Sequence, residues 1–151
     1  MTHETLGKEF LAELEAEAAA TRKCLERVPE SLFAYKPHEK SMAMGYLVQL
    51  VAEIPYWIAY AVEKGDIDFT TFPHGETKTT AAVVAYFDKN MEDVRRALSA
   101  VSDEAMMETF NLKNNGQVLM SMSKKDMTGS SINHLVHHRG QLSVYLRLND
   151  L

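Results

Sequence analysis

The chain has 151 residues, of which 46% are apolar and 25% charged, so it can bury a core in one domain and is too apolar to stay disordered. Its one cysteine excludes an internal disulfide and a cysteine-rich zinc module. Sixteen basic against 21 acidic residues give a net charge of −5, which argues against a nucleic-acid partner. No basic segment followed by an apolar one opens the sequence, as a signal peptide would, so we expect a cytoplasmic protein.

The first half of the chain predicts two long helices joined by a connector. Apolar residues at spacings of three and four predict an amphipathic helix over 2–27. A second helix is predicted over 41–64, with Ser41 as its N-cap. Its apolar stretch, 42–62, is long enough to span a bilayer. Because Glu53 lies near the middle of that stretch, we expect a buried helix of a globular protein and no membrane partner.

The second half predicts two further long helices with a hairpin between them. Helical periodicity extends over 79–101 and again over 125–148. Between these helices, Asn-Gly at 115–116 separates two short alternating runs, 109–112 and 117–122. An Asn-Gly pair in that setting is the strongest local signal of a β-hairpin.

Together these elements predict an all-α fold, a four-helix bundle with a small β-hairpin between its third and fourth helices. Ser123, with Asp126 three residues later, resembles a capping box and is the predicted N-cap of the fourth helix. The sequence contains no internal repeat and no domain boundary, so we expect a single domain over 1–151.

Candidate chemistry concentrates in the fourth predicted helix, which carries three histidines within five positions. His134 and His138 are one helical turn apart, so both imidazoles can reach one metal ion from the same face, and His137 could pair with His134 similarly. The alternative is that these histidines are hydrogen-bonded core or surface residues, and the spacing leaves both interpretations open. His38 and His74 each follow a proline and are predicted to be solvent-exposed loop residues.

The fourth helix also resembles a known family. Residues 134–147, HLVHHRGQLSVYLR, resemble the helix-four signature of the DinB/YfiT-like family of metalloenzymes, and 37–42 and 52–55 resemble its loop and second helix. The resemblance implies a four-helix bundle in an up-down-down-up arrangement, often a homodimer. It further implies a divalent metal ion, nickel or zinc, held by three histidines. Characterised members are thiol-dependent transferases and an isomerase that use bacillithiol, mycothiol or glutathione.

The resemblance assigns two of the three metal ligands in this chain. They correspond to His134 and His138. The family's third histidine, aligned on residues 52–55, falls at position 50, where this chain has Leu50. Leu50 belongs to an apolar stripe at helical spacing, so we expect it in the core, on the inner face of its helix opposite the histidine pair.

Two classes of function follow from these residues. In the first, the protein is a metal-dependent transferase or hydrolase in which nickel or zinc at His134 and His138 lowers the pKa of a thiol or water, and Arg139 or Tyr145 positions an anionic substrate. In the second, the protein is catalytically inactive and binds a small ligand or acts as a dimeric scaffold. The histidine pair favours the first class, and Leu50 favours the second. The expected partners are a second copy of the chain and a small molecule, such as a low-molecular-weight thiol.

Overall fold

The computed structural model describes residues 4–151, which are mostly helical with a small three-stranded sheet. Most of the described chain lies in the long helices α1 (Leu6–Glu26), α2 (Met44–Lys64), α3 (Thr80–Ala100) and α5 (Lys124–Leu148). Two short helices complete the helical part, η1 (Glu30–Leu32) and α4 (Asp103–Met106). The strands are β1 (Ile67–Asp68), β2 (Thr109–Asn114) and β3 (Gln117–Ser123). The predicted start of the first helix, Thr2, lies outside the described residues.

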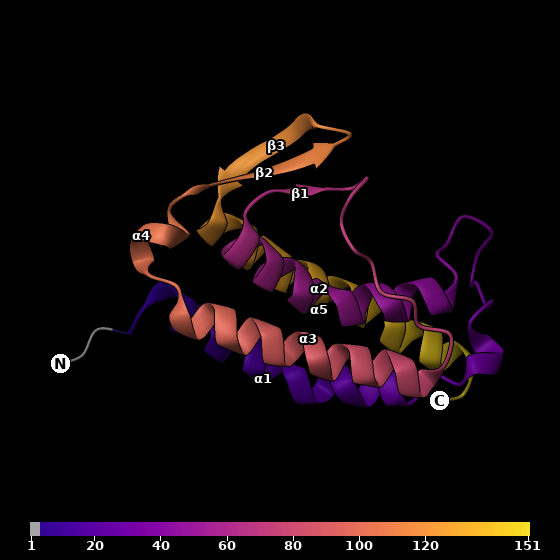
Figure 1. Ribbon diagram of the computed structural model, residues 1–151. Coiled ribbons are helices and arrows are strands. Elements are labelled where there is room, and N and C mark those ends of the chain that lie inside the picture. The colour runs from indigo at the N-terminus through magenta and orange to yellow at the C-terminus, as the bar shows by residue number, and fades with distance from the viewer. Residues whose placement is uncertain (1–3) are drawn as a thin grey trace.

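The long helices pack against one another, and the sheet covers one end of the α2–α5 pair (Figure 1). α1 contacts α3 and α5, and α2 contacts α3 and α5. β1 contacts α2, whereas β2 and β3 contact α5, so the sheet lies on the side of this pair that faces away from α1 and α3 (Figure 1). This arrangement leaves room for side chains of α2, α5 and the sheet to enclose a cavity.

Helix α2 forms the centre of the core because it is apolar on most of its faces. Its fully buried side chains include Leu47, Val48, Val51, Ile54 and Ile58. The buried polar residue Glu53 lies in the same stretch. Among the described residues, none of the helices combines the length and the apolar content needed to cross a membrane.

The helix ends follow the sequence at most points and depart from it at the start of α2. Ser123 is the N-cap of α5 and its hydroxyl accepts from the backbone N–H of Asp126, as predicted. The predicted N-cap Ser41 is wrong, because α2 begins at Met44 after Ala43. Instead of a side chain, a carbonyl of the preceding connector satisfies the free N–H of the first turn. The Met44 N–H donates to the carbonyl of Tyr35 at 2.9 Å.

The sheet contains a strand that the sequence pattern did not predict. β2 and β3 pair antiparallel, and β1 adds to β2 in parallel through Ile67 and Leu112. The turn between β2 and β3 has Asn115 at φ 50° and Gly116 at φ 82°, the left-handed geometry that an Asn-Gly turn supplies. Asp68 of β1 accepts from the backbone N–H groups of Asn115 at 3.0 Å and Gly116 at 2.7 Å. The two-residue strand β1 therefore holds the hairpin turn in place.

We expect acid to release this turn through Asp68. Hydrogen bonds from the Thr70 hydroxyl and from the backbone N–H groups of Thr70, Gly116 and Asn115 lower the pKa of Asp68 to about 2. Because the folded-state pKa is below the ordinary value of 3.8, the carboxylate stabilises the fold above that value, and this stabilisation is lost as the pH falls toward 2. The difference in Tm between the wild type and Asp68→Asn should therefore shrink between pH 4 and pH 2. A difference that stays constant over this range would contradict the assignment.

Candidate functional site

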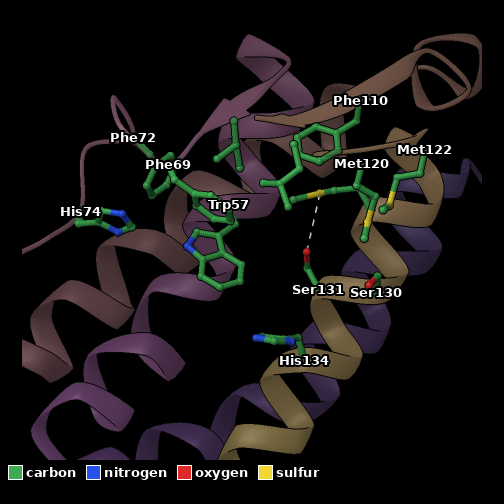
Figure 2. Close-up of a pocket in the computed structure, with 13 residues that line it drawn as sticks. Trp57, Phe69, Phe72, His74, Phe110, Met120, Met122, Ser130, Ser131 and His134 are labelled. Atoms are coloured by element: carbon green, nitrogen blue, oxygen red, sulfur yellow. Dashed lines mark hydrogen bonds between the residues drawn. The ribbon is translucent and has the colours of Figure 1, made fainter. Parts of the chain in front are cut away.

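An apolar cavity of about 290 Å³ lies between the sheet and the α2–α5 pair. Figure 2 shows Phe110, Met120 and Met122 reaching into it from the hairpin, Trp57 from α2, and His134 from α5. Its wall consists almost entirely of aromatic, aliphatic and methionine side chains: Trp57, Ile67, Phe69, Phe72, Phe110, Leu112, Met120, Met122 and Met127. Its few polar side chains are Ser130, Ser131, His74 and His134.

A second cavity, of about 580 Å³ and with more polar groups, adjoins the apolar one. Both are lined by Trp57, Phe69, His74 and His134, so the two cavities meet at these side chains. The polar cavity adds the side chains of Met42, Tyr46, Gln49, Leu50, Glu53 and His138. A ligand at this junction would therefore contact an apolar chamber and a group of imidazoles at the same time.

The two predicted metal ligands, His134 and His138, are brought together on α5. Their Nε2 atoms are 3.0 Å apart, and the two rings meet edge to face. His138 is buried, and its Nδ1–H donates to Oε1 of Gln141 at 2.8 Å. In neutral His138 this bond leaves the lone pair on Nε2, which accepts from the Nε2–H of His134. The pair thus forms an ordered chain of hydrogen bonds that begins at the cavity wall.

His134 is the member of the pair that borders both cavities. Its ring packs on Trp57 with the ring centroids 5.6 Å apart. The pKa of His134 is lowered mainly by its partial burial. Charge repulsion from the neighbouring His138 and His137 lowers it further. Because that shift favours the uncharged imidazole near neutral pH, His134 offers a nitrogen lone pair and not a positive charge.

The residues fit two ligand positions of a divalent ion, and they do not fit a three-ligand centre. Two converging Nε2 atoms and a carbonyl oxygen behind His138 are the arrangement of metal-binding histidines and their supporting shell. Leu50 lines the same cavity as His134 and His138, where it presents an aliphatic side chain in place of a third ligand. Within residues 4–151, no group of three or more histidine, cysteine, aspartate or glutamate side chains could hold an ion.

Leu50 departs from the prediction in its burial. It faces the histidine pair, as the stripe on its helix predicts, but it is half-buried and not part of the closed core. The polar cavity removes packing partners from one side of its side chain, which explains the difference.

Glu53 of α2 lines the polar cavity, and its carboxylate is almost completely buried. Its Oε2 accepts from Nε1 of Trp57 and from Nδ1 of His74, each at 2.9 Å. Its Oε1 accepts from the hydroxyl of Tyr86 at 3.0 Å and from the backbone N–H of Gly75 at 3.2 Å. Burial and the charge of Glu53 raise the pKa of the Tyr86 phenol well above its ordinary value, so the phenol keeps its proton and donates.

His74 is the site residue that sequence reasoning missed. Its side chain is about half exposed, at 52%, yet it lines both cavities and is not simply a solvated loop residue. The loop reaches this position because Gly75 lies flat on the ring of Tyr86, where a Cβ atom would come within 2.5 Å of the ring. The sequence Pro73-His74-Gly75 does not by itself indicate a site residue. The role of His74 depends on its contact with the buried Glu53, 21 positions earlier in the chain.

Two side chains proposed from the sequence to position a substrate lie elsewhere. Arg139 pairs with Glu17 at 2.6 Å and donates to Thr21, which ties α5 to α1. The hydroxyl of Tyr145 donates to the backbone carbonyl of Met42 at 3.1 Å. Neither side chain lines the two cavities, so both serve the packing of α5.

Comparisons with known proteins agree on one family. The model of the DinB family matches residues 1–149. The uncharacterised protein YjoA of Bacillus subtilis is 24% identical over 131 residues, which cover 84% of this chain and 80% of YjoA. The crystal structure of YjoA, a DinB-like protein, superposes with a TM-score of 0.76 at 19% identity, covering 95% of this chain and 93% of that one. A DinB-like protein from Bacillus cereus gives 0.70 at 18% identity, with the same coverage of both chains.

Proposed function

The chain belongs to the DinB family, and we propose that it binds a small molecule whose apolar body fills the apolar cavity and whose polar end meets the histidines. One observation carries the proposal, namely that a cavity with an apolar wall opens onto His74 and His134. Cavities of this size with few, convergent polar groups are the usual form of small-molecule sites. This proposal corresponds to the second class of function that the sequence suggests, a protein that binds a small ligand.

The single tryptophan of the chain offers a direct test of this proposal. Trp57 lines both cavities, so a bound molecule changes its fluorescence. Titration with the neutral dye N-phenyl-1-naphthylamine should quench Trp57 and saturate. Ser130→Phe places a ring at the wall of the apolar cavity and should weaken binding of the dye by about tenfold, which corresponds to about 1.4 kcal/mol.

Ser143→Phe is the matched control, since Ser143 is also exposed on α5 but does not line the apolar cavity. It should bind the dye as the wild type does. Equal weakening in both variants, or no saturable binding to the wild type, would overturn the proposed function.

A second candidate is the metal-dependent enzyme, of the thiol transferase or hydrolase type. It is favoured by the 3.0 Å approach of the Nε2 atoms of His134 and His138, which suits two neighbouring ligands of nickel or zinc. In this candidate Gln141 orients His138, and the apolar cavity holds the substrate beside the pair.

The assembly and the finer topology belong to the same proposal. We infer that α1, α2, α3 and α5 form the up-down-down-up four-helix bundle that the family resemblance implies, which their mutual contacts support. The homodimer stays a prediction, for which α5 offers the exposed apolar side chains of Val136, Val144 and Leu148.

A further inference from the structure

Within residues 4–151, the walls of the two cavities contain an acidic side chain but no permanently basic one. Glu53 is the one acidic side chain among the described residues that line them, and neither lysine nor arginine is present in either wall. The Glu53 carboxylate is 4% exposed and its four hydrogen bonds come from uncharged donors when His74 is neutral. Among the described residues, no lysine or arginine pairs with this carboxylate, whose neighbour at 2.9 Å is the imidazole of His74.

His74 contacts the Glu53 carboxylate and lines both cavities. Its Nδ1 faces the carboxylate of Glu53 at 2.9 Å, and a carboxylate can only accept, so Nδ1 bears the proton. In the neutral ring, Nε2 then holds a lone pair, and no hydrogen bond among residues 4–151 engages it. A ligand at this point meets a hydrogen-bond acceptor whose ring is held in place by a buried carboxylate.

The other polar groups at the junction also favour a donor. His134 lines both cavities, and in the tautomer that donates its Nε2–H to His138 its Nδ1 likewise carries a lone pair. Trp57 lies between His74 and His134 in the view of Figure 2 and lines both cavities. The face of an indole ring attracts a cation.

We propose that the ligand of this site is a protonated primary amine with an apolar chain or ring. The inference rests on the proposed function and names its ligand class. The ammonium donates to Nε2 of His74 and lies near Trp57, with the charge of Glu53 behind the imidazole, while the apolar body fills the apolar cavity. A carboxylate ligand would be repelled, because it would face two lone pairs and a buried negative charge. An alcohol would donate one hydrogen bond but would lack the attraction between an ammonium ion and the Glu53 carboxylate.

Three probes of equal chain length test the ligand class: octylamine, 1-octanol and octanoate. Each is titrated against the wild-type protein at neutral pH with Trp57 fluorescence as the readout. Octylamine should bind at least about tenfold more tightly than 1-octanol, which corresponds to about 1.4 kcal/mol of binding free energy. Octanoate should bind more weakly than both.

A pair of histidine variants then locates the head group. His74→Leu should lower the affinity for octylamine about tenfold and that for 1-octanol by clearly less, because both lose the acceptor but only the ammonium also loses a charge-assisted hydrogen bond. His74→Gln retains an acceptor and should recover part of the loss. The control is His38→Leu, since His38 is also an exposed loop histidine after a proline and lines neither cavity.

The outcomes separate the two proposals. If 1-octanol or octanoate binds as tightly as octylamine, or if His74→Leu leaves octylamine binding intact, the amine assignment is wrong while the cavity remains a binding site. If none of the three probes and no neutral dye binds, the proposed function itself fails.

Discussion

Glu53→Ala is expected to lower the free energy of unfolding by about 3–5 kcal/mol, the largest effect of any single truncation at the site. The change removes the acceptor of the Trp57 Nε1–H and of the Tyr86 hydroxyl, and it leaves the Gly75 N–H with the Tyr86 oxygen alone, all around a carboxylate that is almost completely buried. Urea unfolding followed by far-ultraviolet circular dichroism measures the loss without depending on the fluorescence of Trp57, whose environment the variant itself alters.

The control for this variant is Glu63→Ala on the same helix. Glu63 is exposed and pairs with Arg96 at 3.1 Å, and such surface ion pairs contribute at most about 1 kcal/mol. Glu53→Gln keeps the shape but turns an amide NH₂ toward one of the donor pairs, so its loss should fall between the two alanine variants. Similar losses for Glu53→Ala and Glu63→Ala would show that the Glu53 network contributes little to stability.

Leu50→His is expected to convert the histidine pair into a three-histidine metal site. Leu50 lines the same cavity as His134 and His138, so an imidazole at this position can complete the set and leave one position open for water. At a free nickel or zinc concentration about one hundred times Kd, binding to the folded state adds about 2.7 kcal/mol of stability. For a chain of this length that corresponds to a rise of about 5–10 °C in Tm.

Protein without an affinity tag is required for this titration, with the wild type and two further variants beside Leu50→His. Leu50→Ala opens the same space without a ligand and should show no gain over the wild type. Adding His138→Ala to Leu50→His should abolish the gain. If nickel and zinc raise the Tm of Leu50→His and the wild type equally, position 50 is not the third-ligand position, and a stoichiometric ion retained by the wild type would favour the metal-dependent candidate.

Local sequence signals were sufficient to predict most of the secondary structure and the position of the His134–His138 pair on one helix face. Apolar spacings of three and four, together with the hydroxyl of Ser123, act within one helix and need no partner from elsewhere in the chain. The positions of His134 and His138 on one face follow from helical geometry alone, and their Nε2 atoms indeed meet. The family resemblance likewise depends on contiguous residues, and the match over 1–149 confirms it.

The remaining features depend on contacts between distant segments. β1 is two residues long and exists only because β2 lies beside it, and α2 begins at Met44 because the connector supplies a carbonyl. His74 reaches the site through Glu53, 21 positions away, and through the flat packing of Gly75 on Tyr86. The cavity that leaves Leu50 half-buried belongs to no single element, since its walls come from α2, α5, the sheet and a loop. A hydrophobic pattern specifies which face of a helix turns inward, but only the packed structure decides whether that face meets another side chain or an open cavity.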